Sequence, residues 1–277
     1  MTNVYQTVDM STLAMGGKLY PEDMKIEVRG ASVAEIRTWS NLDENDPMSI
    51  ASHTLAMLTA CVRVTGEGGK SYSVKDIYEH DKLALLLTIH MITFADKADR
   101  MLYIKGRCSN TLCNAEFDKL AVTPANLSYQ APDASYDKYI DRQNGQYVLQ
   151  TKSFGSVEYK PTTIGLGGAM YSWIQSFAPE FIKDNQEMLK TVQAFVTDWR
   201  LANDKSLRKL QIERYNTMTA EQIGFYTALL AKFTIAVSDT LEYVCPHCGA
   251  SFHSQLAIEG GYKGMFVPVQ SLDDELL

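Results

Sequence analysis

Four of the five cysteines stand in two short pairs whose spacing is typical of metal-binding turns. Cys108 and Cys113 enclose four residues, and Cys245 and Cys248 enclose two. A short turn lets two thiolates point at one ion, and four thiolates complete the tetrahedron that zinc prefers. Because the pairs are far apart in the chain, a shared site requires the fold to bring them together. We expect one structural zinc ion with the ligands Cys108, Cys113, Cys245 and Cys248.

Other uses of these cysteines remain open from the sequence. Two incomplete sites could form instead, with His247 and His253 as further ligands of the second pair. Cys245-Pro-His-Cys248 also has the composition of a thiol–disulfide oxidoreductase centre, in which a helix N-terminus lowers the pKa of the thiol. A disulfide or an iron–sulfur cluster would use the same thiols. The fifth cysteine, Cys61, falls on an apolar helical face and is expected in the core.

The cysteines are not accompanied by a recognisable catalytic motif. The sequence contains no H-E-x-x-H, no G-x-S-x-G and no phosphate-binding loop. A zinc ion held by four thiolates also lacks the open position that a catalytic zinc needs. We expect His53 and residues 79–81 (Glu-His-Asp) to be solvated and His90 to be a core residue. These observations predict a protein that is not an enzyme and has no further cofactor.

The composition restricts the class of protein and its partners. The chain has 277 residues, of which 45% are hydrophobic and 21% charged, as in soluble globular proteins. The net charge of -7 and the scattered basic residues argue against a nucleic-acid partner. No run of 18 apolar residues predicts a membrane span, and the N-terminus lacks the pattern of a secretory signal. We therefore expect a cytoplasmic protein.

An internal match indicates a duplication. Residues 26–39 align without gaps with residues 164–177, and residues 112–122 align with residues 247–258 at a similar offset. Two matching blocks in the same order favour two copies of one unit. Each copy is predicted to contain a strand, three helices and a cysteine turn.

The predicted fold class is α+β, predominantly helical, built from two diverged copies of a strand–helix–helix–helix–zinc-knuckle unit. The first unit is assigned to residues 16–125 and the second to residues 153–260. Residues 126–152, rich in Asn, Ser, Asp, Gln and Tyr, are predicted to be a linker, and residues 261–277 a C-terminal tail. A capping box with Thr219 and Gln222 predicts the start of a late helix.

The stretch GGKLYPEDMKIEVRGASVAEI at 16–36, a following helix and CSNTLCNAEF at 108–117 resemble the T4-like phage baseplate hub assembly proteins. The likeness covers about residues 16–122. The second copy departs from it, because Gly167 stands where the first copy has Arg29 and residues 261–277 have no counterpart.

The resemblance implies a non-enzymatic tail protein that helps to build the baseplate hub or stays in it. Its partners would be other phage tail and hub proteins, with neither nucleic acid nor membrane involved. It would be found in the host cytoplasm during assembly and, if retained, in the virion. The alternative is a cellular zinc-ribbon adaptor that binds another protein.

Overall fold

The computed structural model describes residues 4–67, 70–97, 100–194 and 205–267. Of these residues, 44% are helical and 22% lie in strands. The prediction of a predominantly helical fold is therefore wrong, although the α+β class holds. The expectation underestimated the strands because several of them are short and come from the region predicted to be a linker.

The strands form four small antiparallel sheets in the described ranges, with the orders β1-β2-β3, β4-β5, β7-β8-β9 and β11-β10-β6. The strands are β1 (Gln6–Thr7), β2 (Lys25–Val28), β3 (Val62–Thr65), β4 (Tyr103–Arg107), β5 (Glu116–Ala121), β6 (Leu127–Gln130), β7 (Ile140–Asp141), β8 (Gln146–Thr151), β9 (Gly155–Tyr159), β10 (Ala236–Val244) and β11 (Ser251–Gln255).

The α-helices are α1 (Val33–Trp39), α2 (Pro47–Cys61), α3 (Lys82–Thr93), α4 (Ile164–Ile174), α5 (Pro179–Asp184), α6 (Gln186–Gln193), α8 (Lys205–Asn216), α9 (Ala220–Phe233) and α10 (Gly261–Gly264). The described ranges also contain short 3-10 turns: η1 (Met10–Thr12), η2 (Ala14–Gly17), η3 (Val74–Asp76), η4 (Glu79–Asp81), η6 (Pro124–Asn126) and η7 (Ala134–Tyr139).

The local sequence accounts for several helix starts. Asp46 caps α2 through the backbone N–H of Met48, with Pro47 in the first turn, where its missing N–H costs nothing. The predicted capping box at the start of α9 is confirmed: Thr219 accepts from the N–H of Gln222, whose side chain accepts from the N–H of Thr219. These caps determine where the helices begin, and burial of one face against the core supplies most of their stability.

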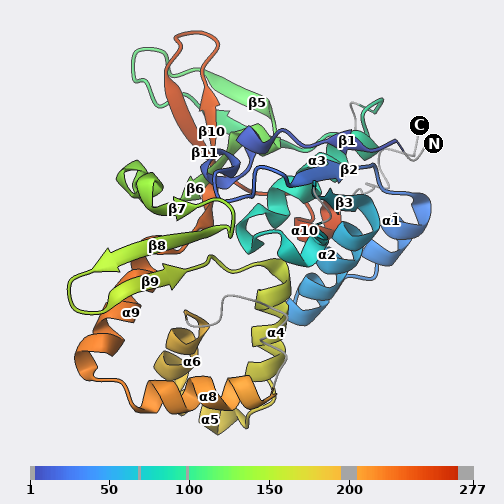
Figure 1. Cartoon of the computed structure of the whole chain (residues 1–277). Coiled ribbons are helices and arrows are strands. Elements are labelled where there is room, and N and C mark those ends of the chain that lie inside the picture. The colour runs from blue at the N-terminus through green and yellow to red at the C-terminus, as the bar shows by residue number, and fades with distance from the viewer. Residues whose placement is uncertain (1–3, 68–69, 98–99, 195–204, 268–277) are drawn as a thin grey trace.

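One main core draws on both predicted repeat units. It contains Leu58 and Leu86 from the first unit and Phe233, Leu241 and Phe252 from the second. Figure 1 shows α1, α2 and α3 beside the β1-β2-β3 sheet, with α4, α5, α6 and α8 gathered at the opposite end of the molecule. Those last helices enclose a smaller second core. The cores therefore do not follow the division at residues 125 and 153.

The N-terminal half of the predicted duplication is contradicted by the structure. Residues 26–28 lie in strand β2, whereas the aligned residues 164–166 form the first turn of helix α4. Thr163 causes the difference, because its hydroxyl accepts from the N–H of Leu166 and caps a helix there. Within the described ranges, the second unit therefore does not begin with the strand that begins the first.

The region predicted to be a linker contains paired strands. Strand β6 joins β10, and β7, β8 and β9 form a meander. In β8, Tyr147 and Leu149 are buried, Val148 between them is half-buried, and Gln150 is exposed. This alternation is what a sheet covered on one face requires.

A buried carboxylate holds the N-terminal turn against the core. Asp81 is 0% exposed and accepts hydrogen bonds from the N–H of Ala14 (2.8 Å) and the hydroxyl of Tyr20 (2.7 Å). Burial raises the pKa of Asp81 to about 6 and lowers the pKa of the neighbouring His80 to about 3. The expectation that residues 79–81 are solvated is thus wrong for His80 and Asp81, because the N-terminal segment folds over this turn.

The C-terminal strap, defined as residues 256–267, packs on the first helices. The indole N–H of Trp39 donates to the carbonyl of Tyr262 (2.9 Å), and the ring of Trp39 lies 5.1 Å from that of Phe266. The predicted tail therefore begins as part of the core, and residues 268–277 lie outside the described ranges. Among the helices of the described ranges, none has the length and apolarity needed to cross a bilayer.

Candidate metal centre

Both cysteine pairs occupy the turns of β-hairpins. Cys108 and Cys113 lie between β4 and β5, and Cys245 and Cys248 lie between β10 and β11. In each hairpin the first cysteine donates its N–H to the carbonyl of an alanine across the turn, Ala115 or Ala250, at 2.9 Å. The C-terminal blocks of the sequence match thus adopt matching structures.

The two turns also share a left-handed residue directly after the second cysteine. Asn114 has φ 52° and Gly249 has φ 71°. Asparagine and glycine are the residues that enter this region most readily. The backbone can therefore reverse so that both thiols of a pair face the same side.

The hairpins pack against each other through equivalent residues. Phe117 and Phe252, which follow the cysteines at matching positions, stack with centroids 5.6 Å apart. The hydroxyl of Ser254 donates to the carbonyl of Lys105 at 2.6 Å, which ties β11 to β4. These contacts bring together two turns that are far apart in the chain.

The packing gathers the four sulfurs into one cluster. Sγ of Cys108 lies 3.6 Å from Sγ of Cys248, and Sγ of Cys113 lies 3.8 Å from Sγ of Cys245. All four sulfurs lie within 4.8 Å of one another. Zinc–sulfur bonds of about 2.3 Å in a tetrahedron place sulfurs about 3.8 Å apart. The cluster therefore has the size of a four-thiolate site around a single ion.

Backbone N–H groups stabilise the sulfurs in the same way in both turns. Cys108 Sγ accepts from the N–H of Asn110, and Cys245 Sγ accepts from the N–H of His247, two residues after each cysteine. Such hydrogen bonds orient thiolate ligands and reduce the charge on the sulfur.

The short distances between the four sulfurs disfavour ionisation of all the thiols together. For Cys245, burial acts to raise the pKa, but hydrogen bonds from backbone N–H groups outweigh it and lower the pKa to about 7. For Cys108, the hydrogen bond from the N–H of Asn110 acts to lower the pKa, yet burial and the neighbouring thiols raise it to about 12. One thiolate thus forms at the expense of the others, as expected for like charges at short range. A bound metal ion would remove this conflict.

The structure places the other candidate ligands outside the cluster. The ring of His247 stacks on Phe117 at 5.9 Å, and His253 is exposed on β11. Cys61 lies in the core as expected, where burial raises its pKa to about 11. The sequence identified all four cysteines of the cluster, but it missed the polar centre at Asp81, for which no local signal exists.

The geometry argues against a thiol–disulfide centre. Such centres lower the pKa of the thiol at the N-terminus of a helix. Cys245 and Cys248 are followed by strand β11, and two cysteines of the other hairpin face them.

Comparison with known proteins adds no identification: no family model, no curated protein and no solved structure matches the chain. The resemblance to phage hub proteins therefore stays a prediction.

Proposed function

We propose that Cys108, Cys113, Cys245 and Cys248 bind one structural zinc ion that clasps the two hairpins of a non-enzymatic assembly protein. The observation that carries the proposal is the cluster itself: four sulfurs from two hairpins, all within 4.8 Å of one another. Four thiolates in a tetrahedral arrangement select zinc or iron–sulfur centres among biological metals. A cluster of several irons and sulfides would need wider spacing between the thiolates than this site has.

A structural role follows from the number of ligands. Catalytic zinc sites keep a position open for water or substrate, and four protein ligands fill the tetrahedron. The ion would instead join β4 and β5 to β10 and β11, which belong to separate sheets. Structural zinc in small units contributes on the order of 10 kcal/mol of folding free energy at neutral pH. The site would therefore act as a clasp between distant parts of the chain.

The proposed setting is the assembly of a phage tail, with other tail and baseplate hub proteins as partners. The sequence resemblance supports this setting. The cysteine turns also present apolar side chains to solvent: Leu112 is 96% exposed and Val244 is 66% exposed. Both side chains are available for contact with another protein.

Metal analysis tests the site directly. Elemental analysis of protein purified without added metal should give one zinc per chain, and Cys108→Ser and Cys245→Ser should each lose it, because a shared site needs both hairpins. Cys61→Ala is the matched control, since it removes the cysteine outside the cluster and should retain the metal. Zinc retained in either serine variant would refute the shared site, and iron in place of zinc would refute the clasp as proposed.

A second experiment tests the setting. Proteins that co-purify with the tagged chain from the cells in which it is naturally expressed should include tail or hub proteins, and Leu112→Asp should reduce their recovery. Recovery of cellular proteins alone would favour the adaptor alternative.

A further inference from the structure

The four thiols of the cluster differ in their access to solvent. Cys248 is exposed and Cys113 is half-buried, whereas Cys108 and Cys245 are 3% and 1% exposed. A thiolate reacts with a soluble oxidant only where the oxidant can reach it. The exposed sulfur of Cys248 is therefore the point at which an oxidant enters the cluster.

Each of the two more accessible thiols has a buried thiol of the other hairpin beside it. Sγ of Cys248 lies 3.6 Å from Sγ of Cys108, and Sγ of Cys113 lies 3.8 Å from Sγ of Cys245. A disulfide bond is about 2.05 Å long, so the sulfurs of either pair need to approach each other by less than about 2 Å. An oxidised Cys248 therefore has a thiol of the other hairpin within reach.

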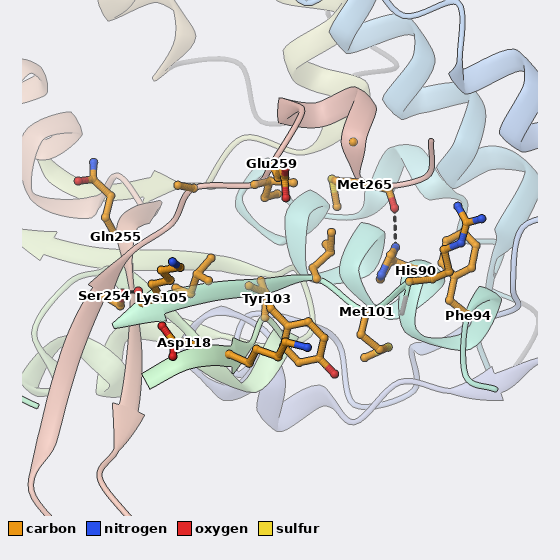
Figure 2. Close-up of a pocket in the computed structure, with 18 of the residues that line it drawn as sticks. His90, Phe94, Met101, Tyr103, Lys105, Asp118, Ser254, Gln255, Glu259 and Met265 are labelled. Atoms are coloured by element: carbon orange, nitrogen blue, oxygen red, sulfur yellow. Dashed lines mark hydrogen bonds between the residues drawn. The ribbon is translucent and has the colours of Figure 1, made fainter. Parts of the chain in front are cut away.

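Contacts outside the cluster hold the two hairpins together independently of the thiols. Phe117 stacks on Phe252 with centroids 5.6 Å apart, and the hydroxyl of Ser254 donates to the carbonyl of Lys105 at 2.6 Å. Figure 2 shows Ser254 and Lys105 beside each other, where β11 passes β4. Because these contacts involve no sulfur, they keep the cysteine turns facing each other when the ion is lost.

We propose that hydrogen peroxide converts the metal clasp into a covalent one, by expelling the ion and linking Cys108 to Cys248 and Cys113 to Cys245. The conversion rests on the zinc site proposed above and deepens it, because it assigns that site a response to oxidation. The hairpins stay joined in both states, by the ion under reducing conditions and by two disulfides under oxidising conditions.

The oxidation consumes one peroxide for each disulfide. The thiolate of Cys248 attacks one oxygen, the O–O bond breaks, and the products are a sulfenic acid on Cys248 and a hydroxide ion. The thiolate of Cys108 then attacks the oxidised sulfur, the S–S bond forms, and the S–O bond breaks with release of a second hydroxide ion. Two electrons pass from the two sulfurs to the peroxide.

The first disulfide removes two of the four metal ligands. Cys113 and Cys245 alone supply fewer than the four ligands of a structural zinc site, so the ion is released at this step. These two thiolates then react with a second peroxide in the same way, with Cys113 attacked first because it is the more accessible of the two.

Peroxide titration of the zinc-bound chain tests the proposal. A coloured chelator should record the release of one zinc per chain. Peptide mapping by mass spectrometry without reductant should find one disulfide between Cys108 and Cys248 and one between Cys113 and Cys245. The first should form in step with zinc release and before the second, because Cys248 is the exposed member of the four. Cys61→Ala is the matched control and should react as the native chain does, since Cys61 is 0% exposed.

Oxidation of the unfolded chain shows whether the fold selects the pairs. In concentrated guanidinium chloride the same treatment should link each cysteine mainly to its partner in the same turn, because short loops close with the smallest loss of entropy. Within-turn disulfides in the folded chain, sulfinic acids in place of disulfides, or zinc retained under peroxide would overturn the proposal. Protein that contains no zinc before the titration would refute the metal site itself and the conversion with it.

Hydrogen exchange measures whether the disulfides join the hairpins as the ion does. A chelator should abolish the protection of amide hydrogens at the two cysteine turns in the reduced chain and leave it intact in the oxidised chain. Reduction with a phosphine followed by addition of zinc should restore the starting state, because disulfide formation is reversible and sulfinic acid formation is not. Equal loss of protection in the reduced and oxidised chains would contradict the covalent clasp.

Discussion

The protein contains two polar centres that join distant segments, and they compensate charge in different ways. The cysteine cluster connects two hairpins, and its thiols lie so close together that a cation would favour ionisation of all of them. The centre at Asp81 connects the N-terminal turn to α3 and relies on hydrogen bonds from Ala14 and Tyr20. Hydrogen bonds alone leave the pKa of Asp81 raised, at about 6.

This difference gives the two centres opposite responses to pH. Metal binding requires deprotonated thiols, so acid should weaken the metal clasp proposed for the cysteines. The folded pKa of Asp81 lies above its unfolded value of 3.8, so its contribution to stability is fully present below pH 3.8 and is lost as pH rises through about 6. Acid should therefore loosen the proposed clasp, whereas it relieves the cost of the buried carboxylate.

Removal of the metal should produce the largest difference in response between the two centres. Chelation should abolish the protection of amide hydrogens at the turns of the β4–β5 and β10–β11 hairpins, because a binding free energy on the order of 10 kcal/mol is lost there. The amides of α3 should stay protected, since Asp81 and the apolar core hold that helix. Hydrogen exchange followed by mass spectrometry measures both regions, and equal loss in both would show that the centres are not independent.

Tyr20→Phe should damage the second centre. It removes a hydrogen bond to Asp81 and the acceptor of the N–H of Tyr78, so we expect a loss of about 2 kcal/mol in the free energy of unfolding. Tyr72→Phe is the matched control, because its hydroxyl bonds Asp23 at a half-buried position and should matter far less. Urea denaturation measures both, and metal content should be unchanged in each variant.

Asp81→Asn should reveal the sign of the pH response. Between pH 8 and pH 5 the native chain should gain about 1 kcal/mol over this variant, because only the native carboxyl takes up a proton in that interval. The pKa of His80 is lowered by burial, which both chains share, so its contribution largely cancels in the difference. A difference that does not vary with pH would show that Asp81 is not buried as described.

The smallest effects should come from the left-handed residues of the two turns. Gly249→Ala adds a methyl group that meets no atom within 4 Å, so its cost is conformational, about 1 kcal/mol. Asn114→Gly should change stability less, because asparagine already tolerates this backbone. Competition with a coloured chelator measures how tightly each variant keeps the metal. A larger effect at Asn114 than at Gly249 would show that the two turns are not equivalent.

The sequence was sufficient for the cysteine cluster because its signals are local. Two short spacings and a matching Ala-x-Phe after each pair indicated two equivalent turns, and the structure brings them together. The prediction from the first matching block, residues 26–39 and 164–177, was wrong because a similar order of apolar residues suits both a strand and a helix. At Ile164 the side chain of Thr163 caps the first turn, which favours the helix.

The Asp81 centre could not be predicted, because its partners are distant in sequence. Ala14 and Tyr20 lie 67 and 61 residues away. A run of Glu-His-Asp before a helix resembles a solvated helix start, and only the folded N-terminal segment shows that it is covered. Local pattern thus locates a turn, and tertiary packing determines its burial.

The separation of the cysteines in the chain has a kinetic consequence. Cys108 and Cys248 lie 140 residues apart, so the cluster cannot exist until both hairpins have formed and met. Contacts of such long range are slow to form, because the entropy of closing a long loop is lost before any contact stabilises the closed chain. Before that event the chain offers only two thiolates at a time, which hold zinc weakly. Metal uptake during refolding would therefore report the last stage of folding, when the two distant parts of the chain first join.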